Sequence, residues 1–138
     1  MSLYYTVLYY IIVKEHTMIE LRTIYKSYWR VSEEVKALQG VSLTIDHAEF
    51  VAVLGASGSG KSTLLNIIGG LDFPDTGEVI IGGQRLNTMK DRDLTLFRRK
   101  RIGYIFQFFN LFPHLTVWEN VVIPHFKGKQ NTLLPFNQ

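Results

Sequence analysis

The run of residues 55–63, Gly-Ala-Ser-Gly-Ser-Gly-Lys-Ser-Thr, constrains this chain more than any other feature of its sequence. The run matches the phosphate-binding pattern G-x-x-x-x-G-K-[ST]. A continuous apolar segment precedes it at residues 50–54, and a second apolar segment follows at residues 62–68. We predict a buried strand, a glycine-rich loop and a helix in that order, which is the context in which this pattern binds phosphate.

The residue types of the loop explain why it suits a phosphate group. Glycines let successive backbone N–H groups turn toward phosphate oxygens, and the start of the following helix adds its unpaired N–H groups and its dipole. Lys61 supplies an ammonium group for the β- and γ-phosphates, and the Ser62 hydroxyl can bind Mg²⁺. The alternative is a glycine-rich surface turn with a stray lysine, which the two apolar flanks disfavour. Nine residues are therefore predicted to bind the nucleotide: Gly55, Ala56, Ser57, Gly58, Ser59, Gly60, Lys61, Ser62 and Thr63.

Length and composition limit the remaining possibilities. The chain has 138 residues, 46% of them hydrophobic and 20% charged, which indicates one modest globular domain. It contains no cysteine, so disulfides and thiolate metal sites are excluded. A formal net charge of +3 permits an anionic ligand but does not by itself indicate nucleic acid.

The first residues need a separate interpretation. Residues 3–13 are apolar, but they are fewer than the roughly 18 that a spanning helix needs, and no basic residue precedes them as in a secretory signal. Three interpretations stay open: an extra strand, a weak membrane-surface anchor, or upstream sequence added by a wrong start codon. We favour the third, because Met18 begins a well-patterned segment.

Local patterns predict the other elements. Residues 19–24, 41–45, 78–81 and 102–106 are predicted strands, and residues 91–99 a helix with acidic residues early and basic residues late. Thr116 and Glu119 have the spacing of a capping box that starts a short helix, which Pro124 ends. Together they predict an α/β nucleotide-binding core with an antiparallel β-subdomain.

Gln107 follows the predicted strand at residues 102–106. Ligands of α/β sheets bind beyond the carboxyl ends of strands, where its side-chain oxygen could bind Mg²⁺ or hold an attacking water. On its own, a glutamine at a strand end is more commonly a solvated polar residue.

From residue 18 to about residue 124 the chain resembles the ATP-binding subunit of an ABC transporter. The resemblance is carried by residues 26–28, 41–45, 55–63, 101–107 and 115–121, and residues 65–72 and 109–112 look closest to the lipoprotein-releasing and macrolide-export branch. It implies an α/β P-loop NTPase core with an antiparallel β-subdomain, as a truncated ABC-type nucleotide-binding domain. We divide the chain into an extension of doubtful origin (1–17), the N-terminal half of an ABC ATP-binding domain (18–124) and a non-matching tail (125–138).

The resemblance also implies ligands and partners. ATP and Mg²⁺ are the expected cofactors, Tyr28 matches the aromatic residue that stacks on adenine, and Ser62 and Gln107 are the expected metal ligands. Without the resemblance, Tyr28 could equally be a strand-edge aromatic packed on the core. The expected partners are a membrane-spanning permease subunit, docked near residues 108–116, and a second ATP-binding subunit in a homodimer. Nucleic acid is not expected, and the expected location is cytoplasmic, peripheral on the inner face of the cell membrane.

An apolar run lies near the end of the resemblance and includes Phe108, Phe109, Leu111 and Phe112. Such residues more commonly belong to the hydrophobic core, but if several of them are exposed, an interface is the better explanation. Ala48 stands where the family usually has glycine, a change that costs little unless φ is positive.

Several family motifs are missing from the sequence: the Leu-Ser-Gly-Gly-Gln signature, the apolar strand that ends in Asp-Glu, and the switch histidine. With no catalytic residue present beyond Gln107, we expect weak Mg-ATP binding at most and no appreciable hydrolysis, although the complete protein would couple ATP hydrolysis to export. The alternatives are a soluble ABC-type ATPase acting on nucleic acid or ribosomes, a P-loop enzyme such as a small kinase, or a non-functional gene fragment. Only the basic run at residues 98–101 could support a nucleic-acid partner, and such a run is usually a solvated helix end.

Overall fold

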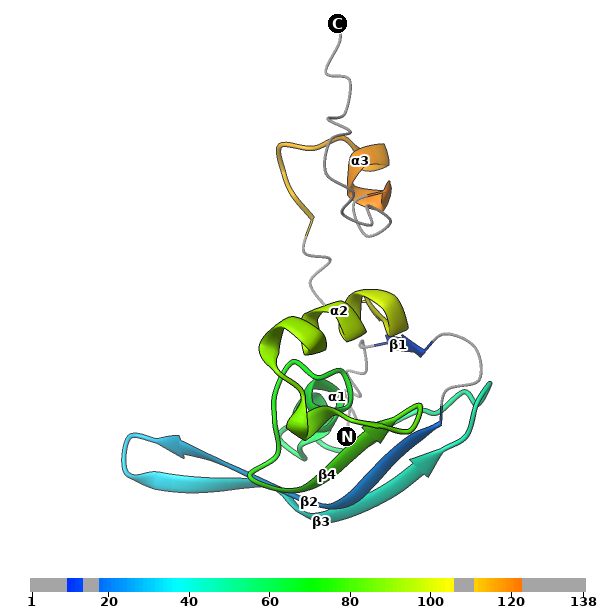
Figure 1. Cartoon of the computed structure of the whole chain (residues 1–138). Coiled ribbons are helices and arrows are strands. Elements are labelled where there is room, and N and C mark those ends of the chain that lie inside the picture. The colour runs from blue at the N-terminus through cyan, green and yellow to red at the C-terminus, as the bar shows by residue number, and fades with distance from the viewer. Residues whose placement is uncertain (1–9, 14–17, 106–110, 123–138) are drawn as a thin grey trace, which may run out of the picture. The chain divides into compact units, whose positions relative to one another are not determined.

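The computed structural model describes residues 10–13, 18–105 and 111–122, in two units that are treated separately (Figure 1). The first unit, residues 1–107, contains all but one of the described elements. In chain order these are β1 (Tyr10–Val13), β2 (Ile19–Arg30), β3 (Glu33–Ile45), α1 (Lys61–Ile68), β4 (Thr76–Ile81), β5 (Gln84–Arg85), the 3₁₀ helix η1 (Leu86–Thr88), α2 (Asp91–Arg101) and β6 (Ile102–Ile105). The second unit, residues 108–138, contains α3 (Val117–Val122).

Four strands form an antiparallel sheet in the order β3-β2-β4-β5. Alternation along β2 buries Ile19 and Leu21 on one face. The alternation breaks at Thr23, whose φ of 50° lies within an irregular stretch of the strand, so that Ile24 returns to the same buried face. The Thr23 N–H donates instead to Ser42 Oγ at 2.9 Å, which satisfies the amide at the irregularity.

The core lies between this sheet and two helices. Helices α1 and α2 lie on the same side of the sheet (Figure 1). Complete burial of an isoleucine such as Ile24 or Ile81 stabilises the fold by about 1.5–3 kcal/mol. The buried core consists of Ile19, Leu21, Ile24, Leu38, Leu64, Ile67, Ile68, Val79, Ile81, Leu86, Leu94 and Phe97.

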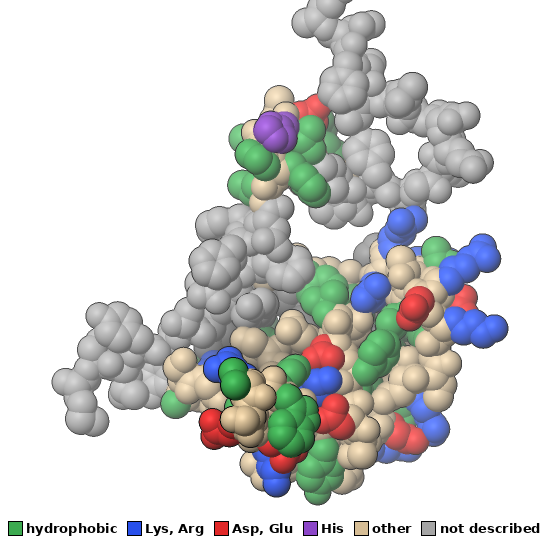
Figure 2. Space-filling model, turned by 90° about the vertical axis from the view of Figure 1, so that its left-hand side faces the viewer, with side chains coloured by type: hydrophobic (Ala, Val, Ile, Leu, Met, Phe, Trp, Pro, Cys, Tyr) green, Lys and Arg blue, Asp and Glu red, His purple; other side chains and the backbone are tan. Residues whose placement is uncertain are grey.

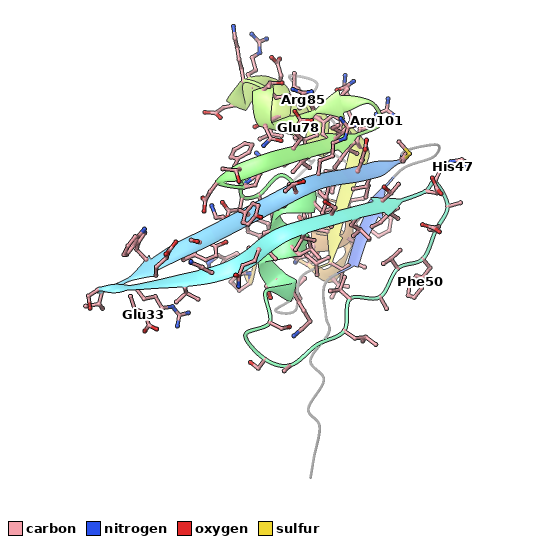
Figure 3. All side chains as sticks on the ribbon, turned by 90° about the horizontal axis from the view of Figure 1, so that it is seen from below. Glu33, His47, Phe50, Glu78, Arg85 and Arg101 are labelled. Carbon is pink, nitrogen blue, oxygen red and sulfur yellow. The ribbon has the colours of Figure 1, made fainter. Side chains whose placement is uncertain are left out.

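Beyond the core, β2 and β3 continue as a two-stranded ribbon with Glu33 at its end (Figure 3). Trp29 pairs with Glu34 and Arg30 with Glu33, and all four residues are exposed. Figure 2 views the molecule from this side and shows hydrophobic side chains among charged ones. The predicted strands at 19–24 and 41–45 are thus confirmed as parts of much longer strands. In the ribbon beyond the core, residues do not alternate between buried and exposed, so the sequence pattern did not predict this part.

Strand β6 pairs antiparallel with β1, from Tyr10 opposite Ile105 to Val13 opposite Ile102. Residues 10–13 therefore form a strand, one of the three interpretations left open for the first segment. The predicted helices at residues 62–68 and 91–99 and the predicted strand at 78–81 are also confirmed, and the predicted strand at 102–106 is confirmed over its described residues, 102–105. The boundaries at residues 17 and 124 stay predictions.

The predicted strand at residues 50–54 is wrong. This segment forms no strand, and Phe50 and Leu54 are 84% and 71% exposed. Figure 3 shows Phe50 on the loop that follows β3, outside the sheet. An apolar run of this kind becomes a buried strand only when strands pair with both of its edges, and within the described residues none pairs with it. Only Val53 packs against the core.

Ala48 lies in the turn between β3 and this segment, with a φ of 63°. The turn is held by a bond from the Asp46 N–H to Glu49 Oε2 at 2.9 Å, and the Ala48 side chain is exposed. The condition under which alanine is unfavourable at this position, a positive φ, is therefore met.

In the second unit, the capping box is confirmed at the start of α3. The Thr116 N–H donates to Glu119 Oε2 at 2.7 Å, and the Glu119 N–H donates to Thr116 Oγ1 at 3.2 Å. No helix within residues 10–13, 18–105 and 111–122 is long and apolar enough to cross a bilayer.

Candidate nucleotide-binding site

The loop before α1 has the backbone that its glycines permit. Gly58 and Gly60 adopt left-handed conformations, with φ of 79° and 86°. A Cβ atom built on Gly60 would stand 2.4 Å from the carbonyl oxygen of Ala37 in β3, so a larger residue cannot be placed there without moving the backbone. This close approach brings the first turn of α1 against the sheet.

Lys61 is held by the loop itself. Its Nζ donates to the carbonyl oxygens of Gly55 at 2.8 Å and Ala56 at 2.6 Å, and lies 3.4 Å from Ser59 Oγ. The Ser59 N–H donates to the Ala56 carbonyl at 3.2 Å, which closes the turn. The ammonium group is therefore fixed among the loop residues instead of extending into solvent.

The start of α1 supplies further donors. The first helical bond here runs from the Leu64 N–H to the Gly60 carbonyl at 2.9 Å. The N–H groups of Lys61, Ser62 and Thr63 precede it, so they have no carbonyl one turn back within the helix and, with the helix dipole, favour an anion. Ser62 is exposed and half-buried Thr63 follows it.

Tyr28 is the predicted site residue that the fold brings to this helix from another element. Its hydroxyl donates to Asp72 Oδ2 at 2.6 Å, and the Asp72 N–H in turn donates to the Asn66 carbonyl of α1 at 3.2 Å. Burial, with the bond to Asp72, raises the pKa of the Tyr28 phenol. The side chain is 36% exposed and is not part of the buried core.

Asp72 is a site residue that the sequence reasoning missed. Its Oδ1 accepts from Lys26 Nζ at 3.0 Å, and that ammonium lies 5.2 Å from the centre of the Tyr28 ring. Burial opposes ionisation of Asp72, but the hydrogen bonds from Tyr28 and Lys26 outweigh it and lower the pKa of the carboxyl. Residues 69–77 could be read only as a loop rich in turn residues, because no local pattern links residue 72 to residue 28.

Gln107 lies outside the described residues, as do Phe108 and Phe109. Leu111 and Phe112, at the end of the same apolar run, are 65% and 57% exposed. Within the described ranges, no three His, Cys, Asp or Glu side chains gather where they could hold a metal ion.

The residues of the basic run at the end of α2 differ in their exposure and contacts. Arg98 is half-buried, and its Nη1 donates to the Gly70 carbonyl at 2.8 Å, so it holds the loop that follows α1. Arg99, Lys100 and Arg101 are exposed, and basic side chains gather at the level of α2 in Figure 2. This arrangement is a solvated helix end with one structural arginine.

Comparisons with known proteins agree with this geometry. Residues 38–136 match the ABC transporter family. The chain is 50% identical over 107 residues to an uncharacterized ABC transporter ATP-binding protein, MJ0796, of Methanocaldococcus jannaschii. The matched region covers 78% of this chain and 46% of that protein. It is 46% identical over 108 residues to the lipoprotein-releasing system ATP-binding protein LolD of Cytophaga hutchinsonii, with 78% and 48% covered. The chain thus spans about half the length of these two curated relatives.

Solved structures give the same result. The dimeric structure of MJ0796, described as a bacterial ABC transporter cassette, matches with a TM-score of 0.77 and 47% identity, over 83% of this chain and 50% of that one. A second structure of MJ0796, in a post-hydrolysis state with ADP and Pi bound, matches with a TM-score of 0.73 and 41% identity, over 85% and 50%. The predicted fold class, a P-loop NTPase core with an antiparallel β-subdomain, is confirmed. With a glycine-rich loop that leads into the helix Lys61–Ile68 and a family match over most of its length, the chain belongs to the ABC transporter family, as part of an ATP-binding component.

Proposed function

We propose that residues 55–63 bind the phosphates of ATP, with Lys61 as the principal charge. The observation that carries this proposal is the position of the Lys61 ammonium, 2.6–2.8 Å from two carbonyl oxygens of the loop. A cation held there by neutral groups, beside the unpaired N–H groups of α1, is prepared for an anion.

The residues present also suit Mg²⁺ bound together with the nucleotide. Mg²⁺ commonly takes only one or two protein ligands and completes its octahedron with phosphate oxygens and water. The exposed Ser62 hydroxyl, next to Lys61, is such a ligand, and we assign Gln107 as the second. Bound Mg²⁺ neutralises charge on the β- and γ-phosphates.

Tyr28 is proposed to stack on the adenine base. Its hydroxyl is bonded to Asp72, whose N–H is bonded to the Asn66 carbonyl of the helix that begins with Lys61, and its partial exposure leaves ring surface for a base. Stacking of a base on an aromatic ring contributes about 1–3 kcal/mol. The relative MJ0796, solved with ADP and Pi, supports a nucleotide as the ligand.

In its complete form such a component is proposed to couple ATP binding and hydrolysis to export. We propose a membrane-spanning permease subunit and a second ATP-binding subunit as partners, at the inner face of the cell membrane. Exposed apolar residues of the second unit support a docking surface for the permease: Leu111, Phe112, Val117, Trp118 and Val121. The dimeric structure of MJ0796 supports the paired arrangement. This chain alone is proposed to bind ATP weakly without hydrolysing it.

Titration of the full chain with a fluorescent ATP analogue and Mg²⁺ tests the proposal. Lys61→Ala is expected to weaken binding by roughly 10- to 100-fold, since hydrogen bonds to charged groups contribute about 1.5–3 kcal/mol. Lys100→Ala removes an equal charge from the exposed end of α2 and is the matched control. Equal affinities for the two variants would overturn the phosphate site, and phosphate release above buffer that Lys61→Ala abolishes would overturn the lack of hydrolysis.

A further inference from the structure

We propose that Asp72 is a positioning residue that fixes the Tyr28 ring for the nucleotide base, and that it sets the affinity for ATP without contacting the phosphates. This inference rests on the proposed function and adds a residue that acts through another one.

The contacts of the Asp72 carboxylate carry the proposal. One oxygen accepts the Tyr28 hydroxyl at 2.6 Å, and the other accepts Lys26 Nζ at 3.0 Å. The same ammonium lies over the Tyr28 ring, 5.2 Å from its centre. Asp72 therefore holds the ring by its edge through the hydroxyl and on one face through Lys26, which leaves the opposite face for a base.

Asp72 is itself fixed to the phosphate-binding helix. The backbone N–H groups of Leu71 and Asp72 donate to the Asn66 carbonyl of α1 at 2.8 and 3.2 Å. Helix α1 begins with Lys61 of the phosphate-binding loop, and its last turn is bonded to Asp72. One short helix therefore connects the phosphate-binding loop to the residue that holds Tyr28.

The same loop is attached to β2 on both sides of Tyr28. Lys26 Nζ also donates to the Phe73 carbonyl at 2.7 Å. The Ser27 N–H donates to Asp75 Oδ2 at 2.6 Å, and the Asp75 N–H donates to the Tyr25 carbonyl at 2.9 Å. The Ser27 and Asp75 bonds hold the strand, and the bond to Phe73 helps to hold the Lys26 ammonium over the ring. Asp72 is the loop residue that bonds directly to the Tyr28 hydroxyl.

A ring held in place before the ligand arrives loses less rotational freedom on binding. Without the bonds from Asp72, the partly exposed ring can turn, and part of the stacking free energy is spent on ordering it. We expect Asp72→Asn to weaken ATP binding by about three- to tenfold, since the amide keeps the shape but loses the charge that binds Lys26 and strengthens the hydroxyl bond.

Two ligands separate the base from the phosphates. For the full chain with Mg²⁺, Asp72→Asn is expected to weaken binding of ATP while leaving binding of inorganic tripolyphosphate unchanged. Lys61→Ala is expected to weaken both. Asp93→Asn, which removes an equal charge from the exposed start of α2, is the matched control and should leave both affinities near those of the parent chain.

A double-mutant cycle tests whether Asp72 acts through Tyr28. Tyr28→Phe removes the hydroxyl and keeps the ring, so Asp72→Asn should have much less effect on ATP binding in that background. NMR titration of labelled tyrosines gives a readout independent of ligand, because Asp72→Asn should lower the pKa of the Tyr28 phenol.

Each outcome has one meaning. If Asp72→Asn weakens ATP and tripolyphosphate equally, or leaves the Tyr28 pKa and ATP affinity unchanged while Lys61→Ala weakens both ligands, the positioning role is wrong and the proposed function stands. If the parent chain binds neither ligand, the proposed function fails and this inference fails with it.

Discussion

Replacement of Ala48 by glycine is expected to stabilise the protein. Ala48 has a φ of 63°, and a left-handed conformation costs an L-residue with a Cβ roughly 1–2 kcal/mol relative to glycine. Its side chain is exposed, so the lost methyl group removes no packing contact with the core. Against this gain, glycine makes the unfolded chain more flexible, which costs about 0.4–1 kcal/mol.

The net gain for Ala48→Gly is therefore about 0.8 kcal/mol, which corresponds to a rise in the melting temperature of about 3 °C for a chain of this size. Urea unfolding followed by far-ultraviolet circular dichroism measures it, with the slope of free energy against urea unchanged because the exposed surface is the same.

Gly83→Ala is the reverse substitution elsewhere in the fold. Gly83 lies in the turn between β4 and β5 with a φ of 73°, and a Cβ atom there would have no neighbour within 4 Å. Alanine at this position should destabilise the protein by about the amount that Ala48→Gly stabilises it. If both variants shift the free energy of unfolding in the same direction, backbone conformation does not control stability at these turns and the reasoning is refuted.

Three further predictions concern the loop, the acid–base behaviour and the second unit. Gly60→Ala should destabilise the fold by about 2 kcal/mol or more and abolish ATP binding, because its φ of 86° and the nearby Ala37 carbonyl both exclude a Cβ. Gly58→Ala is the control, because a Cβ there meets no neighbour within 4 Å, and equal midpoints of urea unfolding for the two variants would contradict a role for the Ala37 contact. Burial raises the pKa of Tyr104 from 10.0 to about 12, so the stabilisation from its neutral phenol is present below pH 10 and is lost as the pH rises through 12. In Tyr104→Phe, the free energy of unfolding measured with urea should fall less steeply over this range, and an unchanged fall would contradict the role of Tyr104. Thr116→Ala removes a helix cap worth about 1 kcal/mol and should speed amide exchange at the start of α3 by about fivefold. Thr116→Ser keeps the hydroxyl and should not, and equal exchange rates in the parent chain and Thr116→Ala would show that the capping box contributes nothing.

The sequence predicted those elements whose signals are local. The helix after the glycine loop, the alternating strands and the Thr116 capping box all depend on neighbours within a few residues, and each is confirmed. The apolar run at residues 50–54 fails because a strand also requires partners elsewhere in the chain, which apolar side chains alone do not reveal.

For the candidate site, the sequence indicated the loop and Tyr28 but not Asp72. The ring and the carboxylate that holds it are 44 positions apart, and their contact depends on the packing of β2 against the loop after α1. The cost at Ala48 could be stated only as a condition on φ, because composition does not determine the turn that the chain adopts.

The pairing of β1 with β6 has a consequence for the order in which the protein forms. Val13 meets Ile102, so this ladder closes a very long loop, whereas the β2–β3 hairpin closes across two residues. Contacts between distant positions lose more chain entropy before they gain any stabilisation. During synthesis the hairpin can therefore form while most of the polypeptide is still being made, but β1 must wait for Ile102 to leave the ribosome.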